Sequence, residues 1–289
     1  MIKEKDKKIA YFHLPGLFEF SYIYKNFLNM YVNEREKFNS WVAIECLYGN
    51  PTECLWGGGR RKSIDVNELE VHRIMTEYNI KSAFTFSNLL IEEKHTSDYF
   101  CNYLCKLFDN GQNYIIVNSP VLEEYILKNY PNYQLISSTT KCIRNIDKIS
   151  IELENDNYSL ICLDYNFNND YRFLEQLNHK DKCELLVNPV CIGNCSRRKE
   201  HYECISKRYL HEPVEDFECE YQFMPFYKAQ QNPLFIGKEA IYKTYLPMGY
   251  NHFKIEGRCA QDDDLIEILL YYLIKPEYQI EIRERLYGL

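Results

Sequence analysis

The chain has 289 residues, of which 46% are hydrophobic, and it carries a formal net charge of −8 at pH 7. This length and composition suffice for a buried core and exclude a disordered chain. The negative charge argues against a general coat for nucleic acid, although a local basic patch leaves RNA open as a partner.

Short apolar, β-branched or aromatic runs alternate along the chain with longer amphipathic segments. The runs predict strands at residues 9–14, 41–49, 82–87, 114–119, 134–139, 159–165, 183–189 and 252–258. Helical patterns lie between them at 17–38, 66–78, 97–110, 121–130, 170–179 and 265–285, and Pro276 should break the last. Only the segment 144–154, after the fifth strand, has no clear pattern.

Eight strands alternating with helices predict parallel βαβ units that close into one (β/α)8 barrel of the TIM type. We expect a single domain over residues 1–289. The one irregular interval, residues 196–251 between the seventh and eighth strands, contains several prolines and aromatic residues and is predicted to be an insertion over the barrel mouth.

No signal peptide follows the charged N-terminus, and the most apolar run, 265–274, is about half the length of a membrane span. We therefore expect a soluble, cytoplasmic protein that makes no membrane contact. The cytosol keeps thiols reduced, so the twelve cysteines should be metal ligands, catalytic thiols or buried thiols. So many thiols would also suit an anaerobic habitat.

Two cysteines, Cys191 and Cys195, follow the seventh strand directly and should lie at the barrel mouth, where such barrels build their sites. Their spacing lets both thiolates bind one metal ion or cluster, and Arg197 would offset the negative charge of a thiolate-ligated cluster. Cys204 and Cys219 follow at longer, irregular spacings, which suit an iron–sulfur cluster better than structural zinc. Packing cysteines are the alternative.

The sequence GGGRRKS (57–63) resembles a phosphate loop but has Arg61 where a P-loop requires glycine before the lysine. Its glycines and Arg60 could still bind an anionic substrate group, or the segment is an ordinary solvated turn. Lys141, after the fifth strand, is a further candidate for anion binding. Asn188, at the end of the seventh strand, is a candidate neighbour of the cofactor.

Three charges, Lys254, Glu256 and Arg258, alternate along the last strand and are predicted to point into the barrel's polar upper layer. Lys254 would bind substrate there. Glu256 would serve as base or as a support for a metal ligand, and Arg258 would bind a carboxylate; a structural ion pair is the alternative. His201 is a candidate acid or base, although a single histidine is more often structural.

The CxxxC after the seventh strand and the FKIEGR of the eighth together resemble the collagenase-like peptidase family of prokaryotes. The resemblance covers the last third of the chain and the barrel plan. Relatives of that family hydroxylate ubiquinone precursors or RNA bases without oxygen and hold a 4Fe–4S cluster with cysteines. The resemblance implies that Cys191 and Cys195 bind the cluster, and we take Cys219 and then Cys204 as candidates for the further ligands. The family's second cysteine pair and its long C-terminal extension have no counterpart here.

These observations predict an iron–sulfur barrel enzyme that acts on a small polar or anionic substrate, by oxygen-independent hydroxylation or related redox or lyase chemistry. Two alternatives stay open. One is a cluster-carrying subunit without chemistry of its own, which binds a partner protein through the aromatic residues of 217–227. The other is a peptidase-like hydrolase.

Overall fold

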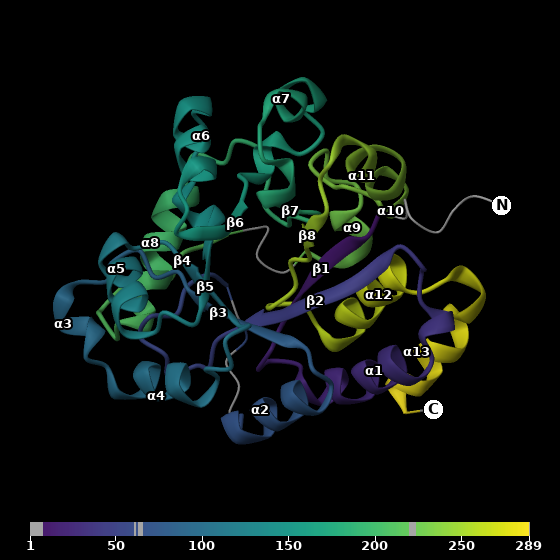
Figure 1. The fold of residues 1–289 in the computed structure, drawn as a ribbon, viewed down its shortest axis with the longest axis horizontal. Coiled ribbons are helices and arrows are strands. Elements are labelled where there is room, and N and C mark those ends of the chain that lie inside the picture. Colours follow the sequence, from purple (N-terminus) through teal and green to yellow (C-terminus); the bar gives the residue numbers. More distant parts are fainter. Residues whose placement is uncertain (1–7, 61, 63–65, 220–223, 289) are drawn as a thin grey trace.

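The structure is a computed structural model, and it describes residues 8–60, 62, 66–219 and 224–288. Eight parallel strands form a closed barrel in chain order, and β1 also pairs with β8. Figure 1 shows the strands at the centre with helices around them. The strands are β1 (Ala10–Pro15), β2 (Val42–Gly49), β3 (Lys81–Phe86), β4 (Tyr114–Val117), β5 (Gln134–Ser137), β6 (Tyr158–Cys162), β7 (Cys183–Leu186) and β8 (His252–Lys254). The predicted (β/α)8 barrel is therefore confirmed, with each predicted strand in its place.

Helices follow the strands as the amphipathic patterns predict. The larger ones are α1 (Ser21–Asn33), α2 (Glu68–Glu77), α4 (Tyr99–Leu107), α5 (Pro120–Asn129), α6 (Ile146–Glu154), α7 (Tyr171–Gln176), α12 (Asp262–Leu273) and α13 (Gln279–Tyr287), and α3 (Glu93–Thr96) is one turn. The ambiguous segment 144–154 is thus mostly helix, because the Asn145 side chain caps α6 by accepting from the Lys148 N–H. Pro276 begins a 3₁₀ turn that separates α12 from α13, as predicted.

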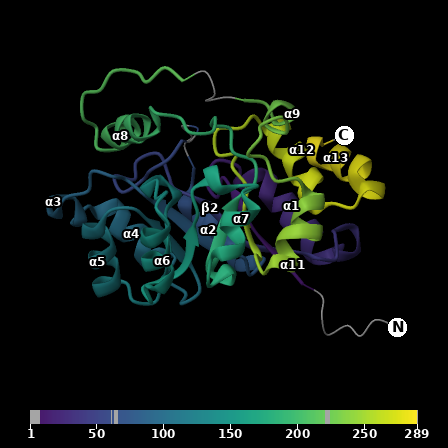
Figure 2. The ribbon, with the colours of Figure 1, turned by 90° about the horizontal axis from the view of Figure 1, so that it is seen from above.

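The chain between β7 and β8 carries α8 (Arg198–Tyr209), α9 (Phe226–Ala229), α10 (Lys238–Ala240), a π-helical turn (Ile241–Tyr245) and α11 (Leu246–Met248). In Figure 2, α8 lies above α4 and α6, and α9 lies toward the same side of the molecule. Tyr202 of α8, Met224 and Phe226 line a cavity at the end of the barrel. Described residues of the segment 196–251 therefore contribute to the wall of this cavity.

Two layers of apolar side chains hold the barrel together. The larger core lies between the sheet and the helices and includes Phe12, Phe84 and Leu269. A smaller cluster fills the barrel interior, with Cys46, Tyr114, Ile116, Ile136 and Leu160 among its members. Within the described residues, no helix is long and apolar enough to cross a membrane.

Candidate active site

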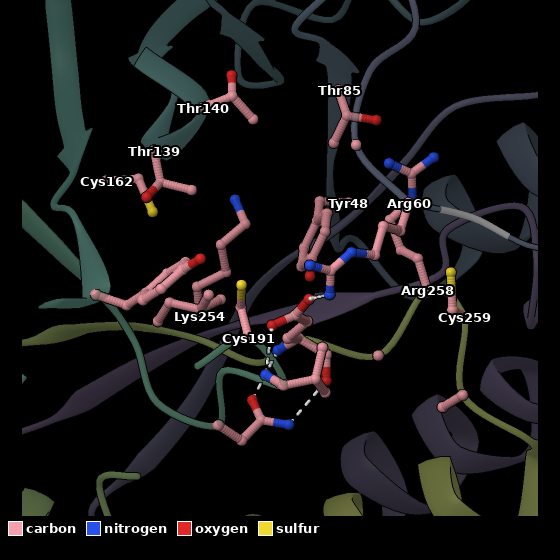
Figure 3. Close-up of a pocket in the computed structure, with 18 of the residues that line it drawn as sticks. Tyr48, Arg60, Thr85, Thr139, Thr140, Cys162, Cys191, Lys254, Arg258 and Cys259 are labelled. Atoms are coloured by element: carbon pink, nitrogen blue, oxygen red, sulfur yellow. Dashed lines mark hydrogen bonds and ion pairs between the residues drawn. The ribbon is translucent and has the colours of Figure 1, made fainter. Parts of the chain in front are cut away.

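A cavity of about 150 Å³ lies at the carboxyl ends of the strands, where TIM barrels build their sites. Its walls are mostly apolar and aromatic, and the segments after β2, β7 and β8 supply most of its charged and sulfur-bearing groups. Figure 3 shows Arg60, Cys191 and Lys254 reaching toward one space from these three elements. Of the residues proposed from sequence, the cavity brings together Arg60, Asn188, Cys191, Lys254, Glu256 and Arg258.

Glu256 is the carboxylate that the surrounding residues fix most firmly at this cavity. Arg60 Nη1 donates to its Oε1 at 3.2 Å, and the Val190 N–H donates to its Oε2 at 3.0 Å. Asn188 holds the backbone of the same residue, accepting from its N–H at 2.7 Å and donating to its carbonyl at 2.8 Å. The side chain of Glu256 is 25% exposed, so it combines a fixed position with access to the cavity. Asn188 acts here as a positioning residue.

Arg258 lines the cavity, but each of its nitrogens already has a protein partner. Nε donates to Glu19 at 2.9 Å, Nη1 donates to the Gly58 carbonyl at 2.9 Å, and Nη2 donates to Asn50 Oδ1 at 2.7 Å. Arg258 and Glu19 are both buried. This arrangement is the structural ion pair that sequence analysis gave as the alternative, and it ties the end of β8 to the glycine-rich loop after β2.

The glycine-rich loop owes its composition to close packing. A Cβ on Gly58 would lie 2.5 Å from the Ser87 backbone, and one on Gly57 would lie 2.5 Å from Asn50 Nδ2. The N–H of Gly57 bonds to the Cys54 carbonyl, and that of Gly58 bonds to the Thr85 carbonyl. Neither N–H is therefore available to an anion. The loop contributes the guanidinium of Arg60 instead, and Arg61 lies outside the described residues.

Beneath the cavity, the barrel interior holds a chain of mostly buried ionisable groups, of which sequence analysis had singled out Lys254 but not His13, Glu184 or His252. Lys254 Nζ lies 3.2 Å from Glu184 Oε2, and His13 Nδ1 lies 2.9 Å from Glu184 Oε1. His13 also contacts Cys46 Sγ at 3.2 Å and His252 Nδ1, through its Nε2, at 3.2 Å. Side chains alternate between the two faces of a strand, which puts these residues on the inner face of the barrel. Glu184, a charged residue inside the apolar run CELLVNP, was the sequence feature that could have indicated this buried chain.

Electrostatics fix the charges in this buried chain. Burial alone would lower the pKa of His13, but its interactions with Cys46 and Glu184 outweigh burial and raise that pKa to about 10. Burial disfavours the charged form of Glu184, yet Lys254 and His13 hold its pKa well below the usual range. The carboxylate of Glu184 therefore lies between two cations.

Two polar atoms at the cavity wall are buried and make no hydrogen bond with the described residues. They are Arg60 Nε and the hydroxyl of Tyr165, which lies just after β6. Burial is the main cause that raises the pKa of Tyr165, and the nearby Cys191 thiol adds to it. Buried polar groups are rarely left without partners, so a ligand that bonds to these two atoms would offset the cost of burying them.

Helix α8 is held on the barrel by Arg198, whose structural role the sequence did not indicate. Its Nη1 donates to Asp164 at 2.7 Å, and its Nη2 donates to the Thr139 carbonyl at 3.0 Å. The guanidinium also lies 3.9 Å from the centre of the Tyr165 ring. Tyr165, which carries one of the two unpartnered atoms, is thereby held in place.

His201 and Arg197, the two α8 residues proposed for catalysis and cofactor binding, both contact Phe217. The His201 ring stacks on Phe217 with centroids 4.3 Å apart, and Arg197 lies 4.2 Å from the centre of the same ring. Burial, and then the charge of Arg60, lower the pKa of His201 to about 4. Neither residue lines the cavity.

Lys141 lies away from the cavity. Its Nζ donates to Glu152 at 3.2 Å and to the Tyr158 hydroxyl at 2.7 Å. These partners belong to α6 and to the first residue of β6, so the ammonium faces the helix layer rather than the barrel mouth.

The four cysteines proposed as cluster ligands occupy different surroundings. Cys191 lines the cavity, and Cys195 packs against the small cluster that Cys191 forms with Tyr165 and Leu186. Cys195 and Cys219 both contribute to the raised pKa of Arg197, after its hydrogen bond to Glu200, so they lie around one guanidinium. The Cys204 thiol donates to the Glu215 carbonyl at 3.5 Å.

A metal centre needs three or four such groups at one point. In the part of the chain that the structure describes, no three His, Cys, Asp or Glu side chains come together in a way that could hold a metal ion. The described side chains, as they lie, bring no full set of cluster ligands to one point, and no chemical step below is derived through a cluster.

The chain was compared with protein-family models, curated proteins and solved structures, and none of them matches it. The fold is therefore identified from the barrel's own topology. The resemblance to the collagenase-like peptidase family stays a prediction from the sequence.

Proposed function

We propose that the chain is an enzyme that transfers protons to and from a small molecule bound in the mouth cavity. The observation that carries this proposal is the position of Glu256, a carboxylate held by Arg60 and by the Val190 N–H beside an otherwise mostly apolar space. General acid–base catalysis requires such a fixed group within reach of the substrate.

The chemistry divides among three side chains. Glu256 accepts a proton from a carbon of the substrate next to a carbonyl or carboxylate group. The ammonium of Lys254 and the guanidinium of Arg60 stabilise the negative charge that then develops on the substrate's oxygen. In an isomerisation, Glu256 returns the proton to a neighbouring carbon. In an elimination, the leaving group departs with its bonding electrons and takes the proton from Glu256.

The direct test is exchange of carbon-bound substrate protons with D₂O, because reversible proton abstraction replaces them with deuterium. Glu256→Gln should abolish the exchange. Turnover by the isolated chain would also distinguish this enzyme from a subunit that works only with a partner protein. A peptidase-like hydrolase would instead cleave a peptide without any such exchange.

An iron–sulfur enzyme is our second proposal. One observation favours it beyond the sequence: Cys191 lies in the cavity wall, and Cys195 packs against the small cluster to which Cys191 belongs. A cluster bound there would supply redox chemistry. Metal and sulfide analysis tests this proposal separately from proton exchange.

A further inference from the structure

The cavity at the barrel mouth also restricts the chemical class of its ligand. Its volume is about 150 Å³, and an apolar protein cavity of about 150 Å³ accommodates benzene. Tyr48, Tyr165, Tyr202 and Phe226 supply much of its wall. A ligand that fits this space has a compact apolar body, either an aromatic ring or a branched chain.

Two unpartnered hydrogen-bond donors at the cavity wall favour an anion. Arg60 donates one hydrogen bond, from Nη1, to Glu256, and its Nε is buried without a partner. The Tyr165 hydroxyl is also buried and unpartnered. Buried donors of this kind are costly unless a ligand binds them, and a carboxylate accepts from a guanidinium with good geometry.

The charges beside these donors indicate how many negative charges the ligand carries. The cations that line the cavity are each paired with a carboxylate: Arg60 with Glu256, Lys254 with Glu184, and Arg258 with Glu19. The other carboxylate of the lining, Asp264, is occupied by the Phe226 N–H and lies in the first turn of α12. Because these cations already face carboxylates, the positive field that remains suits a monoanion better than a phosphate dianion.

From these observations we infer that the site binds a small monocarboxylate with a compact apolar body. The carboxylate accepts from Arg60 Nε and the Tyr165 hydroxyl within the field of Lys254. The apolar body lies against the aromatic wall. This inference rests on the proposed function for the location of the site, and it adds the class of substrate.

The test uses the full chain, with benzoate as the probe and benzyl alcohol as its uncharged counterpart, in titration calorimetry. Hydrogen bonds to charged groups should make benzoate bind about 10- to 100-fold more tightly than benzyl alcohol. Inorganic phosphate should not displace benzoate. Equal binding of the two probes, no binding of benzoate, or displacement by phosphate would overturn the inference.

Two variants locate the binding. Arg60→Gln should remove the preference for benzoate, and Arg208→Gln, which changes an exposed arginine of α8, should retain it. Because Arg60→Gln could also disturb folding through Glu256, Tyr165→Phe provides an independent check. It removes a hydroxyl that bonds to no described residue, so benzoate affinity should fall several-fold with the melting temperature unchanged. Retained preference in Arg60→Gln, or unchanged affinity in Tyr165→Phe, would contradict the inference.

The inference and the proposed function can fail independently. Benzoate binding without proton exchange on any carboxylate would support the proposed ligand class and contradict the proposed enzymatic activity. Proton exchange on an uncharged substrate, with no preference for benzoate over benzyl alcohol, would support the proposed enzymatic activity and contradict the proposed ligand class.

Discussion

Arg60 Nη1 lies 3.2 Å from Glu256 Oε1, which joins a cation from the glycine-rich loop to a carboxylate that follows the last strand. The two residues are far apart in the sequence and meet only because the barrel closes between β8 and β1. Their contact fixes Glu256 at the cavity and leaves most donors of Arg60 free for a ligand.

Replacing Arg258 should affect stability first. Arg258→Gln leaves the Glu19 carboxylate buried without its partner, and breaking a buried ion pair costs about 3–5 kcal/mol. Urea denaturation measures the loss. Arg283→Gln, which breaks a half-exposed pair with Glu267, is the control and should cost less than about 1 kcal/mol. A loss of stability in Arg258→Gln no larger than the control's would contradict the assignment of Arg258 to a structural ion pair.

The raised pKa of His13 predicts a pH dependence of stability. Its folded-state pKa of about 10 lies above the ordinary value of 6.5, so its stabilising contribution is complete below pH 6.5. That contribution is lost as the pH rises toward 10, with a slope of at most about 1.4 kcal/mol per pH unit. His13→Gln should flatten this slope in urea denaturation between pH 6.5 and 10.

His211→Asn, which changes an exposed histidine with a left-handed backbone, should leave that slope unchanged. The groups that face His13 are Cys46 of β2, Tyr114 of β4, Glu184 of β7 and His252 of β8. An identical slope in His13→Gln and the unaltered chain would show that His13 is neutral in the folded protein.

Lys141 and Lys254 should behave differently when each is replaced by methionine. Lys141→Met loses its bonds to Glu152 and Tyr158, which should cost about 1–2 kcal/mol of stability and leave benzoate affinity unchanged. Lys254→Met removes the ammonium at the cavity floor, so benzoate should bind at least about tenfold more weakly. Calorimetry on both variants checks this, and weaker binding by Lys141→Met would contradict the placement of that side chain.

Anaerobic purification followed by iron and sulfide analysis tests the cluster proposal. If the cluster is bound, the chain should be brown, Cys191→Ala should lose colour and iron, and Cys204→Ala should keep both. The difference is expected because the Cys204 thiol is bonded to the Glu215 carbonyl instead. A colourless chain without iron after reconstitution would contradict the cluster proposal and would not affect the proton-transfer proposal.

The barrel could be predicted because eight apolar runs alternate with amphipathic segments, and local patterns of this kind need no knowledge of long-range contacts. The grouping of Arg60, Cys191 and Glu256 followed from the rule that such barrels build their sites at one end. The partners of Arg258 could not be predicted, because Glu19 and Asn50 become its neighbours only when the barrel closes.

Other parts of the site depend on contacts that no spacing reveals. His13 and Glu184 each look like an isolated polar residue in an apolar strand, and only the register of β1, β8 and β7 brings them together. Lys141 shows the converse case. It follows a strand end, as a site residue would, but its side chain turns toward α6.

The most direct test of the central claim is proton exchange in D₂O, followed by ¹H NMR on a panel of small aromatic and branched carboxylates. The unaltered chain should erase the signal of one carbon-bound proton next to a carboxylate or carbonyl group in at least one compound. Glu256→Gln should slow that exchange by at least about 100-fold while retaining benzoate binding. Exchange at an equal rate in Glu256→Gln, or none with any compound, would contradict the assignment of Glu256 as the group that moves the proton.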